Sequence, residues 1–268
     1  MRKITDYRQV LEFNKLIKSS GNRFYTNFYL SKTQVDKLIG SGTIFYVFNK
    51  NSALFFIDEG SFFRLYYSAN HTTFLTGYNS IFKGLSKTVV TDIISKDNNL
   101  DISGFTQYGF SLHKIFRRMS QTKPFDTAYK PTSVLAKYDD KDKIEEALTG
   151  EFDIFAEHLP KKEEIDSAIK KGEILVEKYN GKIAALLMLE NTGVTSILRY
   201  WYVNPKFRGQ GYGGKVFKSY ISIFTNIKRF TLWVDEKNSN AIEKYKHYNY
   251  KFDGLIDYIL VIGHTKEG

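Results

Sequence analysis

The sequence contains no cysteine. Its 268 residues therefore form no disulfide, hold no cysteine-bound zinc and cannot use a cysteine nucleophile. The five histidines show no His-x-His or His-Glu-x-x-His spacing, so we expect no metal site. A Gly-x-Ser-x-Gly motif is also missing, which argues against the nucleophile elbow of the α/β-hydrolases.

Long apolar runs are missing as well. The apolar runs at residues 184–189 and 258–262 have the length of strands and are too short to span a membrane as a helix. The segment from Met1 to Tyr7 lacks the apolar core that signal peptides carry. With 42% hydrophobic and 16% aromatic residues, the composition is that of a globular protein. We therefore expect a cytoplasmic protein that does not enter the membrane.

Proline is scarce, with four residues in the chain, and its placement is informative. Two of them, Pro124 and Pro131, lie in the polar stretch of residues 120–133. Because proline interrupts helices and central strands, we interpret this stretch as the connection between two domains. The predicted division is a first domain over residues 1–125, a linker over 126–134 and a second domain over 135–268.

The same order of elements occurs twice, with a period of about 130–140 residues, which is the size of a domain. Residues 30–42 and 159–172 each show apolar residues at helical spacing and end at glycine. Three apolar runs separated by polar turns follow each of them, which predicts an antiparallel meander. In the first copy we expect helices at 6–19, from Ser31 and at 80–85, and strands at 43–48, 53–57, 62–68 and 88–95.

Four glycines lie close together in the second copy, within Arg208-Gly-Gln-Gly-Tyr-Gly-Gly-Lys215. This stretch follows an apolar and aromatic run at residues 196–203, which predicts a buried strand. Apolar residues at helical spacing begin again at Val216, so a helix starts at or just after the glycines. A glycine-rich turn at a helix N-terminus presents free N–H groups and the positive end of the helix dipole. Phosphate is the ligand that this arrangement favours.

Two other phosphate-binding loops fit the spacing less well. A Walker loop requires Ser or Thr after Gly214-Lys215, where this chain has Val216. Gly209, Gly211 and Gly214 satisfy the dinucleotide pattern Gly-x-Gly-x-x-Gly, and the next strand ends at Asp235, as a ribose-binding acid would require. However, a Rossmann turn is tighter, and little sequence remains after Asp235 to complete a doubly wound sheet.

A third pattern fits better. Arg208-x-x-Gly211-x-Gly213 resembles the R/Q-x-x-G-x-G/A signature of the GNAT superfamily of acyl-CoA-dependent N-acyltransferases. Residues 238–250 are similar to a second segment of that family, N-x-x-A-x-x-x-Y-x-x-x-G-F, with Asn249-Tyr250 in place of Gly-Phe. Asparagine suits that place because it tolerates the left-handed conformation that follows a helix. The first copy has no such glycine loop, which implies a degenerate unit that has lost cofactor binding.

The resemblance implies an α/β (α+β) fold of two tandem GNAT-like domains, each a mixed, mostly antiparallel twisted sheet flanked by helices. It also implies acetyl-CoA as the acyl donor. The backbone of the glycine loop would hold the pyrophosphate, and the strand edge at Val203, where the family's sheet splays, would pair with the pantetheine amides. The residues assigned to cofactor binding are Tyr202, Val203, Arg208, Gly209, Gln210, Gly211, Tyr212, Gly213, Gly214, Lys215 and Asn238. Asn238 can equally serve as a helix cap.

Tyr245 matches the family tyrosine that protonates the departing thiolate. A phenol with a pKa of about 10 can assist a thiol with a pKa of about 8–9. A core position for the Tyr245 side chain is the alternative, in a chain with 19 tyrosines. Many members of the family carry a glutamate as general base on the strand before the glycine loop. Residues 196–203 of this chain contain no carboxylate, so the general base is not identified. Glu190 and Glu236 are the candidates at strand ends, and both also suit solvated turns.

The positive charge of the chain is uneven. Residues 1–134 contain 18 basic and 9 acidic residues, against 21 and 20 in the remainder. A basic first half can attract an acidic partner, or it can be a solvated lysine-rich surface.

The leading hypothesis is an N-acetyltransferase that transfers an acetyl group from acetyl-CoA to a primary amine of a small molecule or peptide, by direct attack in a ternary complex. We expect it to act as a monomer with an internal pseudo-dimer or as a homodimer. The alternative is a non-catalytic acyl-CoA-binding or regulatory module, which the missing strand carboxylate favours. Nucleic-acid binding through the basic and aromatic first half is less well supported.

Overall fold

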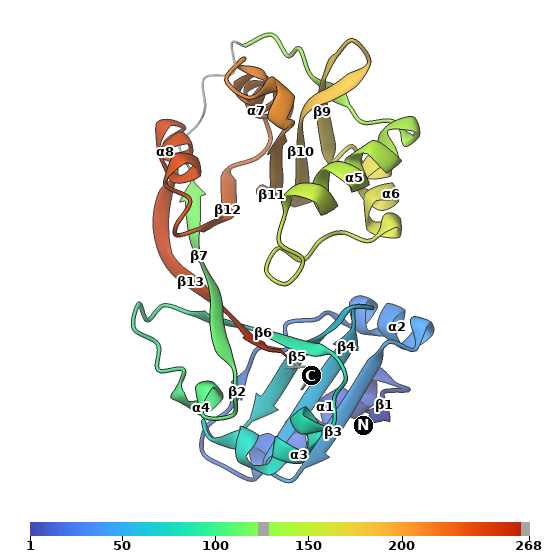
Figure 1. Cartoon of the computed structure of the whole chain (residues 1–268), viewed down its shortest axis with the longest axis vertical. Helices are drawn as coiled ribbons and strands as arrows, with labels where there is room; N and C mark the ends of the chain where they lie inside the picture. The colour runs from blue at the N-terminus through green and yellow to red at the C-terminus, as the bar shows by residue number, and fades with distance from the viewer. Residues whose placement is uncertain (123–128, 264–268) are drawn as a thin grey trace, which may run out of the picture. The chain divides into compact units, whose positions relative to one another are not determined.

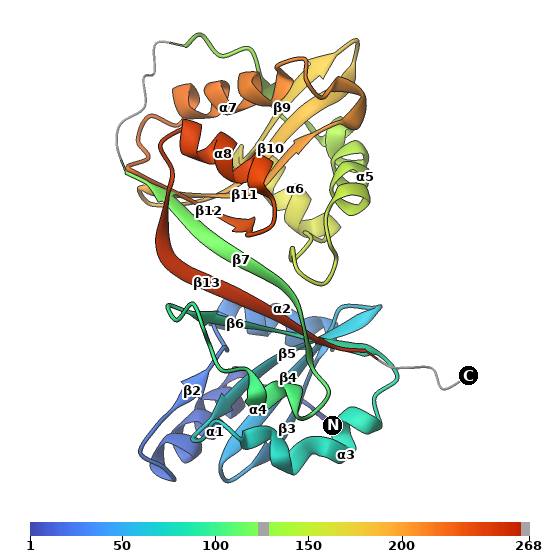
Figure 2. The ribbon, with the colours of Figure 1, turned by 60° about the vertical axis from the view of Figure 1, so that its left-hand side comes forward.

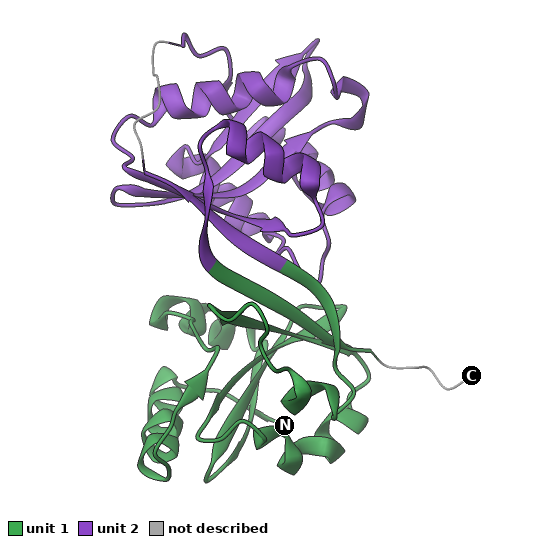
Figure 3. Cartoon of the chain, turned by 90° about the vertical axis from the view of Figure 1, so that its left-hand side faces the viewer, with its two compact units in different colours: residues 1–115, 255–268 green, residues 116–254 purple. Residues whose placement is uncertain are grey.

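The computed structural model describes residues 1–122 and 129–263. The chain forms two compact units, which are residues Met1–Ile115 with Leu255–Gly268 (unit 1) and residues Phe116–Gly254 (unit 2), as Figure 3 shows. Each unit has a mixed and mostly antiparallel sheet with helices packed on it (Figure 1). The fold class predicted from the sequence is confirmed.

Unit 1 has two helices, α1 and α2, ahead of a meander of the strands β3, β4 and β5. The strand order is β1-β3-β4-β5-β6, followed by the last strand of the chain, β13 (Lys251–Ile262). All of these neighbours are antiparallel except β5 and β6, which are parallel. The bounds are β1 (Arg2–Lys3), α1 (Tyr7–Ser19), β2 (Tyr25–Thr26), α2 (Lys32–Ser41), β3 (Ile44–Asn49), β4 (Ser52–Asp58), β5 (Phe62–Ala69), η1 (Phe74–Tyr78), α3 (Asn79–Lys83), β6 (Thr88–Ser95) and α4 (Ser103–Thr106).

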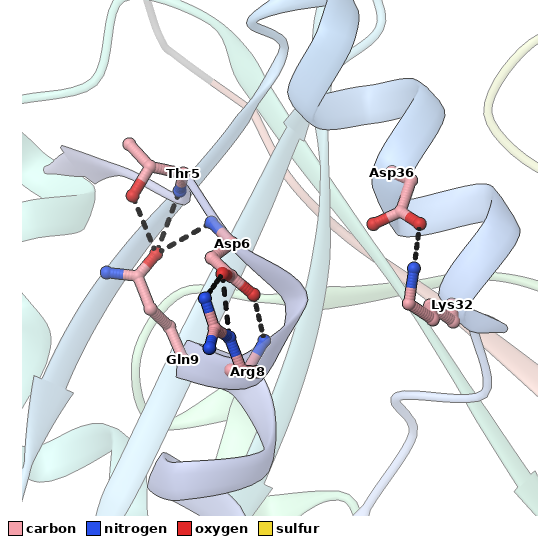
Figure 4. A network of polar contacts seen from close by, with 6 residues as sticks. All are labelled: Thr5, Asp6, Arg8, Gln9, Lys32 and Asp36. Atoms are coloured by element: carbon pink, nitrogen blue, oxygen red, sulfur yellow. Dashed lines mark hydrogen bonds and ion pairs between the residues drawn. The ribbon is translucent and has the colours of Figure 1, made fainter.

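The first two helices start at capping boxes that the sequence contains. Asp6 accepts a hydrogen bond from the N–H of Arg8, and the side chain of Gln9 accepts one from the N–H of Asp6 (Figure 4). Ser31 and Gln34 form the same reciprocal pair at the start of α2. These boxes satisfy N–H groups that the first helical turn leaves unpaired, and a single cap is worth about 1 kcal/mol. They fix the starts of α1 and α2.

Unit 2 repeats this plan. Its strand order is β7-β12-β11-β10-β9-β8, and the parallel pair is β11 and β12. The bounds are β7 (Ser111–Gln121), β8 (Val134–Leu135), η2 (Tyr138–Asp140), α5 (Lys141–Glu151), α6 (Lys162–Lys171), β9 (Ile174–Tyr179), β10 (Lys182–Thr192), β11 (Thr195–Val203), η3 (Pro205–Phe207), α7 (Tyr212–Ile223), β12 (Arg229–Asp235), α8 (Ser239–His247) and β13 (Lys251–Ile262). The corresponding helices α2 and α6 both end at a left-handed glycine, Gly42 with φ 67° and Gly172 with φ 69°.

Two long strands, β7 and β13, are divided between the units. The end of β7, residues 116–121, pairs with β12 inside unit 2. The end of β13, residues 256–262, pairs with β6 inside unit 1. The compact units therefore have other bounds than the predicted ranges 1–125 and 135–268: residues 116–125 belong to unit 2, and residues 255–268 belong to unit 1. Of the predicted linker, residues 126–128 lie outside the described part of the chain, and Val134 already belongs to β8.

The core of unit 2 lies on both faces of its sheet. Helices α7 and α8 cover one face, and they appear together in front of the sheet in Figure 2. Side chains of α5 and α6 pack with Tyr200 and Tyr202 of β11 on the other face. Buried apolar side chains such as Leu187, Phe217 and Leu232 are removed from water on folding, which supplies most of the stabilisation of such a layered unit. This packing fixes the position of β11, which ends at the glycine-rich loop.

Candidate functional site

The sheet of unit 2 opens beside β11. This strand pairs with β10 along its length, but with β12 only where residues 195–198 lie opposite residues 229–232. From Arg199 to Val203 its second edge has no strand beside it in the part of the chain that the structure describes. Alternate residues of such an edge point their N–H and C=O groups into the gap, where an extended ligand can pair with them as a strand would. The splay implied by the family resemblance is thus present.

A β-bulge lies where β11 and β12 separate. The register between β10 and β11 shifts after Met188, so that Arg199 is the extra residue of β11. The Arg199 guanidinium donates to the carboxylate of Glu190 at 3.1 Å and to the carbonyl oxygen of His158 at 3.2 Å. The strand-end glutamate considered as a base from the sequence therefore forms an ion pair with Arg199.

Tyr200 holds the segment between α5 and α6 against β11. Its hydroxyl lies 2.7 Å from the carbonyl oxygens of both Glu157 and His158. Burial raises the pKa of Tyr200 to about 12, so the hydroxyl stays protonated and can donate. His158 has a φ of 47°, a conformation that residues other than glycine adopt rarely. The α5–α6 segment is therefore fixed beside the bulge.

The glycine-rich loop forms the turn that the sequence predicts. Gly209 and Gly211 have φ values of 77° and 83°, and Gly211 is the N-cap of α7. At the start of α7, the first backbone N–H group that has an acceptor is that of Lys215. It donates to the carbonyl of Gly211 at 3.0 Å. The four preceding N–H groups, from Gly211 to Gly214, have no acceptor among the described residues. Free N–H groups at a helix N-terminus are suited to binding an anion.

Gly213 is required for a different reason. A Cβ atom at this position would lie 2.9 Å from Cγ2 of Val203 and 3.4 Å from the indole nitrogen of Trp201. A side chain there would therefore push the start of α7 away from the end of β11. No heavy atom lies within 4 Å of a Cβ placed on Gly209 or Gly211, so those two glycines are needed for their backbone conformation rather than for space.

Side chains at the start of the loop and of α7 contact the rest of unit 2. Nε of Arg208 donates to the carbonyl of Val203 at 3.1 Å, and its guanidinium pairs with Glu151 at 2.5 Å. The rings of Phe207 and Tyr212 pack against each other, with centroids 5.6 Å apart, and both contact Tyr179. The Arg208 side chain thus makes its contacts within the protein, and the loop N–H groups from Gly211 to Gly214 have no acceptor among the described residues.

Tyr245 lies in an aromatic cluster beside the gap. Its ring packs against Trp201, whose indole also stacks on Phe217 with centroids 5.0 Å apart. The Tyr245 hydroxyl makes no hydrogen bond within the described residues, and the buried indole N–H of Trp201 has no acceptor there either. Burial raises the pKa of Tyr245 well above its ordinary value, and the Glu157 carboxylate raises it further. The phenol is therefore a protonated acid throughout the neutral range.

Other predicted site residues have different surroundings. The Tyr202 side chain packs on the α5–α6 face, so that its backbone rather than its ring lies along the open edge. Asn238 accepts a hydrogen bond from the N–H of Ala241 and thereby caps α8. Lys215 lies with its ammonium 5.0 Å above the ring of Tyr212. Glu236 is an exposed residue of the turn before α8.

Two residues that interact with Tyr245 were not predicted from the sequence. Glu157 belongs to an irregular segment, and no motif marks it; its relation to Tyr245 depends on the placement of that segment by Tyr200. Trp201 was expected only as part of a buried strand. The bulge at Arg199 changes which side chains of β11 face α7, and a single sequence does not reveal it.

Comparison with known proteins agrees with this geometry. Residues 141–250 match the acetyltransferase (GNAT) family. Among solved structures, the whole chain resembles a tandem GNAT protein from the clavulanic acid biosynthesis pathway, with 10% identity over 96% of this chain and 94% of that chain and a TM-score of 0.59. A GCN5-related N-acetyltransferase from Sphaerobacter thermophilus has 14% identity over 84% of each chain and a TM-score of 0.58. One from Kribbella flavida has 11% identity over 87% of this chain and 94% of that chain, with a TM-score of 0.57.

At these identities the structural matches establish the fold alone, and the family match lies within unit 2. Comparison with curated proteins found no match. The duplicated plan of the two units agrees with the fold of the tandem GNAT protein. Residues 141–250 thus match the GNAT acetyltransferase family, and the fold of the chain is similar to that of a tandem GNAT protein.

No helix in residues 1–122 or 129–263 is both long and apolar enough to cross a membrane. Within the same residues, no group of three or more His, Cys, Asp or Glu side chains is placed to hold a metal ion.

Proposed function

We propose that this protein is an acyl-CoA-dependent N-acetyltransferase that transfers an acetyl group from acetyl-CoA to a primary amine. The observation that carries the proposal is the coincidence of two features on β11. The strand has an open edge from Arg199 to Val203, and it leads directly into a loop with four free N–H groups. The first feature suits an extended amide-containing arm and the second a diphosphate, in the order in which coenzyme A carries them.

In this proposal the loop binds the donor through its backbone. The N–H groups from Gly211 to Gly214 would donate to the diphosphate oxygens, and the positive end of α7 would add to the attraction. The open edge of β11 would pair with the amides of the pantetheine arm. These contacts would direct the thioester toward the end of the gap where Tyr245 and Trp201 lie.

The chemical step is the attack of a neutral amine on the thioester carbonyl. A carbon–nitrogen bond forms, the carbon–sulfur bond breaks, and the proton of the ammonium intermediate must leave. Tyr245 would donate its hydroxyl proton to the departing thiolate, which the raised pKa of the phenol permits at neutral pH. Glu157 is our candidate for accepting the amine proton, because its charge acts on Tyr245 and its backbone carbonyl is held by the Tyr200 hydroxyl.

The assignment of Glu157 gives a testable result. Replacing Glu157 with glutamine is expected to lower kcat/KM for the amine by about 10²-fold, because general base catalysis is typically worth at least that much. Steady-state kinetics at saturating acetyl-CoA measure this loss. Glu190→Gln is the matched control, since Glu190 forms an ion pair with Arg199; equal losses in the two variants would remove Glu157 from the mechanism.

The proposed activity is tested by the release of free thiol. Full-length protein is incubated with acetyl-CoA and a pool of polyamines, aminoglycosides, amino acids and peptides, and the thiol is measured spectroscopically. We expect amine-dependent release above the rate of hydrolysis. Binding of acetyl-CoA without release in the presence of any amine would instead favour the alternative, a regulatory acyl-CoA-binding module.

A further inference from the structure

Unit 1 contains a second gap of the same kind. Its parallel strands β5 and β6 pair only where residues 62–64 lie opposite residues 88–90, just as β11 and β12 separate after four paired residues. Strand β4 occupies the other edge of β5 from Phe63 to Ala69. The edge of β5 that faces the gap is therefore the structural counterpart of the open edge of β11.

In unit 1 this gap is filled by the chain itself. The short strand β2 pairs with β5, with Tyr25 opposite Ala69 and Thr26 opposite Ser68. Since β4 holds the other edge at these same residues, β2 lies on the gap side. The hydroxyl of Thr26 donates to the carbonyl of Tyr67 at 2.7 Å, which adds a side-chain bond to the backbone pairing.

Asn27 closes the gap where β5 and β6 diverge. Its carboxamide oxygen accepts the N–H of Tyr67 at 2.7 Å. Its Nδ2 donates to the carbonyl of Asp92 at 2.9 Å and to the hydroxyl of Thr91 at 3.1 Å, both on β6. The side chain is 3% exposed, so these bonds are made away from water. One side chain thus bridges two strands that no longer pair with each other.

We propose that β2 and Asn27 are an intramolecular substitute for the extended arm of an acyl donor, and that unit 1 consequently takes no donor of its own. The segment between α1 and α2, to which they belong, has its counterpart in the segment between α5 and α6. In unit 2 that segment is held at Tyr200 instead and leaves the edge of β11 open. The two units differ in whether this connection enters the gap.

The chain after β5 supports this assignment. Where unit 2 has left-handed glycines before a helix of 12 residues, unit 1 has η1, whose residues Phe74, Leu75 and Tyr78 are buried. Gly77 of η1 is not among the glycines with positive φ. The 3₁₀ turn and the five-residue helix α3 that follows present no glycine-lined anion site. Unit 1 therefore has an occupied gap and also lacks the loop for a diphosphate.

Two measurements on the full-length chain test the proposal. Asn27→Ala removes the bridging carboxamide, and we expect the Tyr67 amide to exchange its hydrogen at least tenfold faster, while the control Asn98→Ala, at an exposed loop position, leaves it unchanged. Thr26→Ala is a milder second variant in case Asn27→Ala folds poorly. Calorimetric titration of the wild type with coenzyme A should give one site per chain, and Asn27→Ala should not alter its affinity.

The hydrogen-exchange measurement and the calorimetric titration can each contradict the proposal independently. Tyr67 protection in Asn27→Ala equal to that in Asn98→Ala would overturn the proposal, as would two coenzyme A sites in the wild type. The titration arm rests on the proposed function, whereas the exchange arm does not. If the wild type bound no coenzyme A, the proposed function would fall, and the exchange of the Tyr67 amide would by itself decide whether the gap of unit 1 is occupied.

Discussion

Replacing Tyr245 with phenylalanine is expected to lower kcat by about 10²–10⁴-fold, the usual worth of a positioned general acid. The variant loses the proton donor for the departing thiolate but keeps the ring that packs on Trp201. Because the hydroxyl makes no hydrogen bond within the described residues, the melting temperature should change little. Thiol-release kinetics at saturating acetyl-CoA and amine, together with a thermal scan, measure both quantities.

Tyr250→Phe is the matched control for Tyr245→Phe. The Tyr250 ring lies in the same cluster, 5.9 Å from that of Tyr245, but its hydroxyl is fully buried and cannot reach a ligand. The pH dependence gives a second check. Burial raises the pKa of Tyr245 above its ordinary value of 10.0, so the acid form should persist and the alkaline limb of kcat should lie above pH 10. Tyr248, at the C-terminal end of α8, is the competing tyrosine, since its ring also lies near Trp201, with centroids 6.2 Å apart. Loss of activity in Tyr248→Phe with full activity in Tyr245→Phe would contradict the assignment of Tyr245.

Replacing Gly211 with valine is expected to raise the dissociation constant for coenzyme A by roughly 10–100-fold. A β-branched residue does not tolerate a φ of 83°, so the turn must change its conformation and the N–H groups at the start of α7 lose their common direction. Loss of one hydrogen bond to a charged group accounts for about 1.5–3 kcal/mol, which corresponds to the stated range. Isothermal titration calorimetry measures the change.

A second glycine separates loop geometry from general strain. Gly193 also has a positive φ, 58°, and open space where a Cβ would stand, but it lies in the turn between β10 and β11 at the other end of the strand. Gly193→Val should therefore destabilise the protein about as much as Gly211→Val does, by about 1–2 kcal/mol. It should not change the affinity for coenzyme A. Equal weakening of binding by both substitutions would show that the loop has no special role.

The elements that are determined locally could be predicted from the sequence. The capping residues Asp6 and Ser31 and the left-handed Gly172 set helix ends through contacts a few residues apart. The helix α8 was expected to be followed by a left-handed residue, and Asn249 has a φ of 65°. The glycine loop was equally readable, because its geometry depends on residues that are adjacent in the chain.

The features that depend on long-range pairing were not predictable. Nothing in the apolar run of β13 indicates that residues 256–262 pair with β6, about 160 residues earlier in the chain. Asn27 looks like any polar residue between two helices until β5 and β6 separate around it. Glu190 was a candidate base because it ends a strand, whereas its ion pair with Arg199 depends on the bulge across the hairpin.

The central claim is that the N–H groups at the start of α7 bind the diphosphate of the donor, and a paired titration tests it most directly. Full-length protein is titrated by calorimetry with coenzyme A and with pantetheine, which has the amide arm but neither the diphosphate nor the nucleotide. Our account predicts one site for coenzyme A and binding to pantetheine that is weaker by at least 100-fold. Equal affinity for the two compounds, or no binding of coenzyme A, would contradict it.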